Sequence, residues 1–202
     1  LLAQAFGLKT TKTMFKRLKR FFSRFKRFKP MPKPKPKPRL RFALDSRTKK
    51  NIQSLNKKVQ PVFIQLMQIA KAKGKQYGGP NCEVKAISGF RSFAQQQKIY
   101  NQGRTTKGPI VSYSKPGSSL HNFALALDLG IFIDRKYMDA VDSKFVYKVY
   151  KSIATEADVQ GLPIMWGGNF KSFCDSPHFE YMSGLTMAQL RERRTSGKPL
   201  IA

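Results

Sequence analysis

The sequence contains few residues of several types, and each shortage excludes a class of protein. Its two cysteines, Cys82 and Cys174, are too few for the disulfide framework of a small secreted domain, although they could form one bridge. It has no run of eighteen apolar residues, so no segment is expected to span a membrane. It has 11 acidic residues against 39 Lys and Arg, which gives a net charge of +28. This excess predicts a polyanionic partner: nucleic acid, anionic lipid or the acidic bacterial envelope.

The positive charge is unevenly distributed along the chain. Residues 1–50 hold 18 Lys and Arg and one acid, Asp45, whereas the other 152 residues hold 21 Lys and Arg and 10 acids. This distribution predicts a cationic N-terminal arm (1–29), a linker (30–41) and one domain (42–202). The last segment is long enough to bury a core of its own.

Residues 14–29 of the arm predict a cationic amphipathic helix. On a helical wheel the apolar residues gather on one face, opposite eight Lys and Arg and no acid. Such a helix is typical of a membrane interface. Packing on the chain's own domain and neutralisation of nucleic-acid phosphates are alternatives, but five phenylalanines on one face favour contact with lipid or protein. The residues assigned to binding are Phe15, Leu18, Phe21, Phe22, Phe25 and Phe28 on the apolar face, and Lys16, Arg17, Arg20 and Arg24 on the cationic face.

A Lys-Pro repeat at 32–38 follows, which predicts an extended, self-repelling spacer. It would hold the arm away from the domain. A second interpretation of the arm is a structural anchor in a virion or assembly component, ordered by a partner.

The only two histidines lie in segments that can form two halves of one metal site. His121 precedes an apolar stretch containing Asp128, and His178 follows Asp175 by three residues. Histidine and carboxylate are ligands of Zn²⁺, and three protein ligands leave a fourth position for water. His121, Asp128 and His178 would be those ligands, which leaves Asp175 as a nearby carboxylate that can transfer protons.

Spacing alone does not decide between metal ligands and ordinary histidines. Residues 123–130 are apolar apart from Asp128 and predict a buried strand, where a carboxylate needs a partner or a cation. In a continuous strand, the seven-residue spacing would place His121 and Asp128 on opposite faces. His121 must therefore lie in a loop or bend, for which residues 116–119 have suitable composition. Pro177 predicts a turn before a short extended segment at His178.

Several motifs together resemble a known family. They are SLHNFALALDLGIF (119–132), GGNFKSFCDSPHFE (167–180), SGFRSF (88–93) with Gln96, and YNQGR (100–104). The segment 45–180 resembles zinc peptidases that cut peptidoglycan stem peptides: the D-alanyl-D-alanine carboxypeptidases and the L-alanyl-D-glutamate endopeptidases, which include many phage endolysins. The resemblance implies that His121, Asp128 and His178 bind zinc, that Asp175 is the catalytic base and that Arg91 lines the substrate cleft. Ala124 stands where the family has glycine.

The chemistry of the remaining candidates leaves some alternatives open. Arg91 could pair with a substrate carboxylate or a developing oxyanion, or form a structural salt bridge. Glu180 could orient His178, or be an exposed residue at a strand end. Ser119 and Gln96 are candidates for the substrate cleft, and Ser119 lacks the partners of a serine nucleophile. Cys174 is not taken as a ligand, because the set is complete and a free cysteine is commonly a small buried hydrophobe.

The periodicity of residues 45–202 predicts an α+β domain, a small antiparallel sheet flanked by helices, and the resemblance implies the same fold. Helices are expected at 46–70, with a kink or break at Pro61, and at 93–100, 143–158 and 187–194. Strands are expected at 83–88, 123–130 and 178–181, and a long loop at 105–119. The resemblance implies hydrolysis of stem peptides, with cleavage between L-Ala and D-Glu favoured over removal of a terminal D-Ala. It also implies action at the bacterial cell wall or in the periplasm, and a phage-encoded or secreted origin. The rival hypothesis is a virion or assembly protein with a degenerate peptidase-like domain, against which the complete ligand set weighs.

Overall fold

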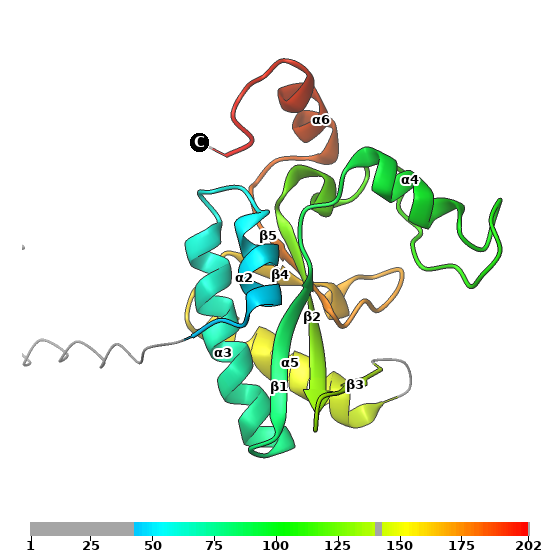
Figure 1. The fold of residues 1–202 in the computed structure, drawn as a ribbon. Helices are drawn as coiled ribbons and strands as arrows, with labels where there is room; N and C mark the ends of the chain where they lie inside the picture. Colours follow the sequence, from blue (N-terminus) through cyan, green and yellow to red (C-terminus); the bar gives the residue numbers. More distant parts are fainter. Residues whose placement is uncertain (1–42, 140–142, 202) are drawn as a thin grey trace, which may run out of the picture. The chain divides into compact units, whose positions relative to one another are not determined.

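The computed structural model describes residues 43–139 and 143–201, which form an antiparallel sheet flanked by helices (Figure 1). The helices are α2 (Ser46–Gln53), α3 (Gln60–Gly78), α4 (Phe93–Asn101), α5 (Lys144–Val159) and α6 (Met187–Thr195), and 3-10 turns lie at Leu120–Phe123 and Gly167–Asn169. The strands are β1 (Cys82–Ser88), β2 (Ala126–Ile133), β3 (Lys136–Met138), β4 (Ile164–Trp166) and β5 (His178–Tyr181). The α+β prediction is confirmed. The predicted arm and linker lie outside the described residues and stay predictions.

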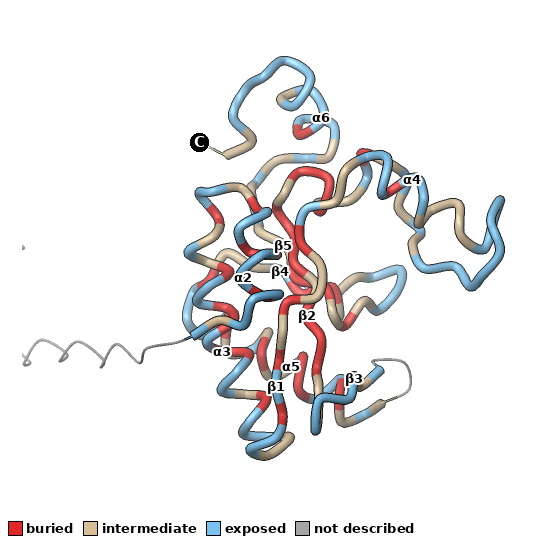
Figure 2. Tube along the Cα trace, in the orientation of Figure 1, coloured by how far each residue is buried: buried red, intermediate tan, exposed pale blue. Residues whose placement is uncertain are grey.

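β2 is the central strand of the sheet. The strand order is β1-β2-β5-β4, with β3 paired to β2, and every pair is antiparallel. From Ala126 to Ile131 the strand is buried except at Asp128, which is partly exposed. Figure 2 shows the buried residues concentrated along the strands and on the facing sides of α3 and α5. One carboxylate therefore interrupts the best-covered strand of the fold.

The helices α2, α3 and α5 pack against the strands. α2 and α3 contact β1, and α5 contacts both α3 and β4. The hydroxyl of Tyr150, which is fully buried in α5, donates to the carbonyl of Leu129 in β2 at 2.7 Å. This bond fixes α5 on the central strand and satisfies a hydroxyl that would otherwise be costly to bury. No helix of the described residues is long and apolar enough to cross a membrane.

Capping side chains explain where several helices begin. Asp45 accepts from the N–H of Thr48 at the start of α2, and Ser92 forms a capping box with Gln95 at the start of α4. Pro61 lies in the first turn of α3, where its missing N–H has no cost. The helix expected at 46–70 is indeed broken, but the break lies at residues 54–59, just before Pro61, and separates α2 from α3.

The predicted strand at 123–130 is wrong at its beginning, because β2 begins at Ala126. The chain first forms the 3-10 turn Leu120–Phe123, and Ala124 then adopts left-handed backbone angles, which lie outside the range of a regular strand. β3 and β4 were not predicted. Each has three residues, and each depends on pairing with a neighbouring strand rather than on a pattern of its own.

The two cysteines are free thiols, so they do not form a bridge with each other. Cys82 is buried, as a small hydrophobe would be. Cys174 is exposed, which corrects the expectation that it is buried. Its thiol lies 3.3 Å from the hydroxyl of Ser176, in the loop that precedes β5.

Candidate metal centre

Asp128 and His178 face each other across neighbouring strands. The register of β2 and β5 places Asp128 opposite His178. On the other side of β2, a bulge in β1 after Ala86 brings Ser88 opposite Asp128. Directly opposed residues of an antiparallel pair project from the same face of the sheet. The carboxylate of Asp128 and the imidazole of His178 therefore point to the same place.

His121 reaches this place from the turn before β2. Ala124 adopts φ 58° and ψ 36°, and its carbonyl accepts from the N–H of Asn56 at 3.0 Å. The left-handed residue reverses the chain between His121 and Asp128, so their seven-residue spacing no longer implies opposite faces. The expectation that His121 lies in a bend before the strand is confirmed.

Three nitrogen and oxygen atoms converge at the centre of this site. His121 Nε2 lies 3.0 Å from Asp128 Oδ1 and 3.2 Å from His178 Nδ1, and the latter lies 3.0 Å from Asp128 Oδ1. His121 and His178 are buried, 2% and 7% exposed. One ligand atom from each residue lies within 4.8 Å of the others, a grouping that could hold a metal ion. The structure brings together the three residues that the sequence analysis named as ligands.

The outer ring nitrogens of the two histidines also have partners. His121 Nδ1 lies 2.7 Å from the carbonyl of Gly89, and His178 Nε2 lies 3.2 Å from Glu180 Oε2. A carbonyl and a carboxylate accept, so these nitrogens carry the proton and donate. Each imidazole is thereby left with its other nitrogen, His121 Nε2 or His178 Nδ1, directed at Asp128. This is the arrangement that metal-ligating histidines commonly have.

The charges at the site favour a cation at its centre. Burial by itself would lower the pKa of His178, but Asp128 and Glu180 raise it to about 10. Burial would likewise raise the pKa of Asp128, but the two histidines hold it well below its usual value. The two acidic groups thus favour positive charge at the centre of the site. A divalent cation would supply that charge, so the donor set fits zinc.

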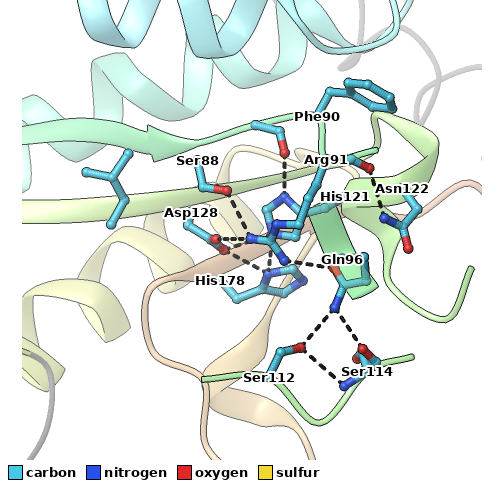
Figure 3. A network of polar contacts seen from close by, with 12 residues as sticks. Ser88, Phe90, Arg91, Gln96, Ser112, Ser114, His121, Asn122, Asp128 and His178 are labelled. Carbon is cyan, nitrogen blue, oxygen red and sulfur yellow. Dashed lines mark hydrogen bonds and ion pairs between the residues drawn. The ribbon is translucent and has the colours of Figure 1, made fainter. Parts of the chain in front are cut away.

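Arg91 connects Asp128 to a polar network on the other side of the site (Figure 3). Its guanidinium lies 3.6 Å from Asp128 Oδ2 and donates to the hydroxyl of Ser88 and to Gln96 Oε1. Gln96 is fully buried and donates to Ser112 Oγ and to the carbonyl of Ser114. Through these bonds Arg91 and Gln96 tie the long loop at 102–119 to the site.

Asp175 lies in the loop that leads to His178. Its N–H donates to the carbonyl of Gly167, and its own carbonyl accepts from the N–H of His178, both at 3.1 Å. A side chain at Gly167 would stand 2.6 Å from that Asp175 carbonyl, so the close approach requires glycine. Burial raises the pKa of Asp175 above its ordinary value, although His178, His121 and Arg91 oppose the shift. A raised pKa is what a carboxylate that accepts a proton in the reaction needs.

The remaining sequence candidates divide into two groups. Glu180 is in contact with His178, and Gln96 is in contact with Arg91. Ser119 stands at the start of the 3-10 turn and contributes its carbonyl to the N–H of Asn122. Its expected place in a substrate cleft stays a prediction.

Sequence reasoning missed a chain of aromatic rings that begins at His178. The ring of Phe170 lies 5.8 Å from that of His178, Phe173 lies 5.6 Å from Phe170, and Tyr113 lies 6.1 Å from Phe173. Tyr113 is 70% exposed and Phe173 is 44% exposed. Two loops, at 102–119 and 170–177, thus place aromatic side chains beside the site. The signal in the sequence was the presence of aromatic residues in otherwise polar loops.

Comparison with known families identifies the chain. The VanY family, described as D-alanyl-D-alanine carboxypeptidase, matches residues 52–182. The chain belongs to the VanY family. It is an enzyme of that metallopeptidase family, and its three candidate ligands lie inside the matched region. The matched region ends before α6.

The chain is also similar to individual known proteins. The chain is 35% identical over 129 residues to the peptidoglycan L-alanyl-D-glutamate endopeptidase CwlK of Bacillus subtilis (strain 168), which covers 60% of this chain and 72% of the relative. Two solved structures are also similar. The L-Ala D-Glu endopeptidase ChiX of Serratia marcescens covers 67% of this chain and 86% of its own, with 19% identity and a TM-score of 0.47. A vancomycin-resistance D,D-pentapeptidase VanY in complex with Zn(II) covers 72% and 81%, with 16% identity and a TM-score of 0.41.

Proposed function

We propose that this VanY-family chain is a zinc-dependent peptidase that hydrolyses stem peptides of bacterial peptidoglycan between L-Ala and D-Glu. The observation that carries the proposal is the convergence of His121 Nε2, Asp128 Oδ1 and His178 Nδ1. Both histidines have their outer nitrogen engaged, by Gly89 and by Glu180. The rival hypothesis of a degenerate, purely structural domain would lead us to expect a damaged ligand set, and this set is complete.

Zinc held by these three residues would activate a water molecule for attack near neutral pH and polarise the scissile carbonyl. The chain's own residues then manage the protons. Asp175, whose pKa is raised by burial, accepts a proton from the attacking water and passes it to the leaving amine. A backbone bond, from the N–H of His178 to the carbonyl of Asp175, joins this residue to one of the proposed ligands.

Arg91 has a position suited to an anionic group of the substrate. Its guanidinium is held between Asp128, Ser88 and Gln96, so its direction is fixed before the substrate binds. A fixed guanidinium can pair with a substrate carboxylate or with the oxyanion that develops at the carbonyl, without reorganising. We assign it that role rather than a purely structural one.

The choice of bond rests on the relatives. CwlK is named as an L-alanyl-D-glutamate endopeptidase, and it is 35% identical to this chain over 129 residues. The family description names a D-alanyl-D-alanine carboxypeptidase, so removal of a terminal D-Ala is the competing activity within the same site.

The proposed substrate places the enzyme outside the cytoplasm, at the cell wall or in the periplasm. We propose that the arm at 1–29 binds an anionic membrane or envelope surface and that the linker at 30–41 separates it from the domain. The charge and the phenylalanine face of the arm support this. Nucleic acid is the less favoured polyanion for the same reason, and a phage-encoded or secreted origin fits the proposed site of action.

Digestion of purified peptidoglycan tests the proposal. After incubation with the full chain, mass spectrometry identifies the new termini. We expect new N-terminal D-Glu on the released peptides and L-Ala left at the end of each truncated stem. Release of free D-Ala would reassign the bond, and an unchanged substrate would refute the proposed activity. The variant His178→Ala is the matched control, because it removes one ligand and leaves the arm and Asp175 unaltered.

A further inference from the structure

The turn that carries His121 has two kinds of hydrogen-bond partner for its carbonyls. Those of Ser119, Leu120, His121 and Ala124 accept from backbone N–H groups. The carbonyls of Gly117 and Asn122, which flank His121, accept instead from side chains of α6. Arg191 Nη1 donates to Gly117 at 3.1 Å, and Arg194 Nη1 donates to Asn122 at 2.9 Å.

Arg194 makes a second contact with the surroundings of the turn. Its guanidinium lies over the ring of Phe93, 4.6 Å from the centroid, a favourable cation–π geometry. Phe93 packs edge-to-face on Phe123, the last residue of the 3-10 turn, with 6.2 Å between ring centroids. Arg194 thus contacts the turn directly at Asn122 and indirectly through Phe93.

α6 is itself firmly attached to the domain. Leu190, directly before Arg191, is fully buried in the core. Thr186 and Gln189 form a capping box that fixes the first turn of the helix. A helix held at its buried face can impose a position on the groups that its arginines bind.

Asn122 transmits that position to the metal site. Its side-chain oxygen accepts from the N–H of Gly117, and its amide donates to the carbonyl of Arg91. The N–H of Arg91 in turn donates to the carbonyl of His121. Arg194, Asn122, Arg91 and His121 therefore form one connected set of bonds.

We infer that Arg191 and Arg194 are positioning residues for His121: α6 holds the 3-10 turn so that His121 Nε2 faces Asp128 and His178, and it thereby sets the affinity of the site for zinc. The inference rests on the metal site of the proposed function. It assigns a role in the metal site to α6 (187–195), which lies beyond the residues 52–182 that match the family. Partners that orient metal ligands from outside typically change metal affinity about 10–100-fold when removed.

The test is the zinc dissociation constant of the full chain, measured by competition with a chromophoric chelator at 25 °C. We expect Arg194→Ala to weaken zinc binding about tenfold and Arg191→Ala with Arg194→Ala to weaken it up to about a hundredfold. Arg194→Lys, which keeps the charge and one donor, should recover part of the loss. Arg193→Ala is the matched control on the same helix, because Arg193 donates to the carbonyl of Pro199 and not to the turn.

Circular dichroism and melting of the zinc-free variants separate positioning from stability. If Arg194→Ala only loosened the fold, its melting temperature would fall while its zinc affinity stayed within about twofold of the parent, and the inference would be overturned. If Arg194→Ala fails to fold, the zinc affinities of Arg191→Ala and Arg194→Lys test the inference instead. An unchanged zinc affinity in both of these variants would also overturn the inference. A parent chain that binds no zinc would refute the proposed metal site instead, so the two failures are distinguishable.

Discussion

Glu180 Oε2 accepts a hydrogen bond from His178 Nε2 across 3.2 Å, two residues along the same strand. Residues two apart in a strand project from the same face, so the pairing follows from the geometry of β5. The bond leaves His178 Nδ1 for Asp128 and His121. Glu180 thereby selects the nitrogen that a metal would meet.

Removing Glu180 should weaken metal binding without unfolding the domain. We expect Glu180→Ala to raise the zinc dissociation constant about 10–100-fold, because His178 loses the partner that fixes its tautomer. The zinc dissociation constant of Glu180→Gln should lie between those of Glu180→Ala and the parent, since an amide oxygen can still accept a hydrogen bond. Glu83→Ala is the control, because Glu83 pairs with Lys85 on β1. Chelator competition measures all three, and a parent-like affinity in Glu180→Ala would refute the role.

Ala124→Gly should stabilise the domain. Ala124 has φ 58°, a left-handed conformation that costs a residue with a Cβ about 1–2 kcal/mol and glycine almost nothing. Glycine also has a larger conformational entropy in the unfolded state, which offsets part of this effect. We therefore expect the free energy of unfolding to increase by roughly 0.5–1 kcal/mol and Tm to rise by about 2–4 °C. Ala126→Gly, in the regular backbone of β2, should instead lower Tm. Thermal melting decides, and a lower Tm for Ala124→Gly would show that the turn relies on the methyl group.

The cap of α2 should give the domain a defined acid dependence. Desolvation opposes ionisation of Asp45, but hydrogen bonds from Thr48 and the charge of Lys85 leave its pKa lowered in the folded state. Stability from this group is therefore present above its unfolded pKa of about 3.9 and is lost as pH falls through the folded value.

We therefore expect Asp45→Ala to lower the free energy of unfolding by about 1 kcal/mol at pH 7, and the difference from the parent to shrink as pH falls below about 4. Asp45→Asn keeps a capping oxygen without a titrating charge, so its free energy of unfolding at pH 7 should fall by less than that of Asp45→Ala. Urea unfolding at several pH values measures these differences. A difference between Asp45→Ala and the parent that persists unchanged at pH 2–3 would contradict this account.

The arm should act separately from the enzyme. A peptide of residues 1–40 should bind anionic vesicles and become helical there, with roughly 1 kcal/mol for each Lys or Arg near the surface. Serine at Phe21, Phe22 and Phe25 removes the apolar contact and leaves the charge, so this triple variant should bind more weakly. Parent-like binding by it would leave simple polyanion attraction as the explanation. A chain that begins at Arg41 should still digest isolated peptidoglycan, and its inactivity would make the arm part of the enzyme.

The candidate ligands could be named from the sequence because the chain has only two histidines and one carboxylate inside an apolar strand, and the resemblance to zinc peptidases favoured the metal site over ordinary histidines. The geometry of the site could not be predicted. The bulge in β1, the left-handed Ala124 and the register of Asp128 with His178 depend on contacts between segments far apart in the chain. The alternation of apolar and polar residues within one segment cannot predict how that segment pairs with a distant strand.

The larger elements were predictable for a different reason. α3, α5 and α6 bury a continuous apolar stripe or begin at a recognisable cap, and these signals are local. The three-residue strands β3 and β4 have no local signal and exist through their partners. The same holds for Arg191 and Arg194 of α6, because no local pattern in the sequence indicates that they bind the carbonyls of Gly117 and Asn122.

The most direct test of the central claim is cleavage of one defined stem peptide, L-Ala-γ-D-Glu-L-Lys-D-Ala-D-Ala, which contains both candidate bonds. Chromatography follows the products of the zinc-loaded full chain, of the chelated chain, and of Asp175→Asn at equal zinc content. The account predicts release of L-Ala by the loaded chain, none after chelation, and a rate about 10²–10⁴-fold lower in Asp175→Asn. Release of D-Ala in place of L-Ala, cleavage that survives chelation, or a near-normal rate in Asp175→Asn would contradict it.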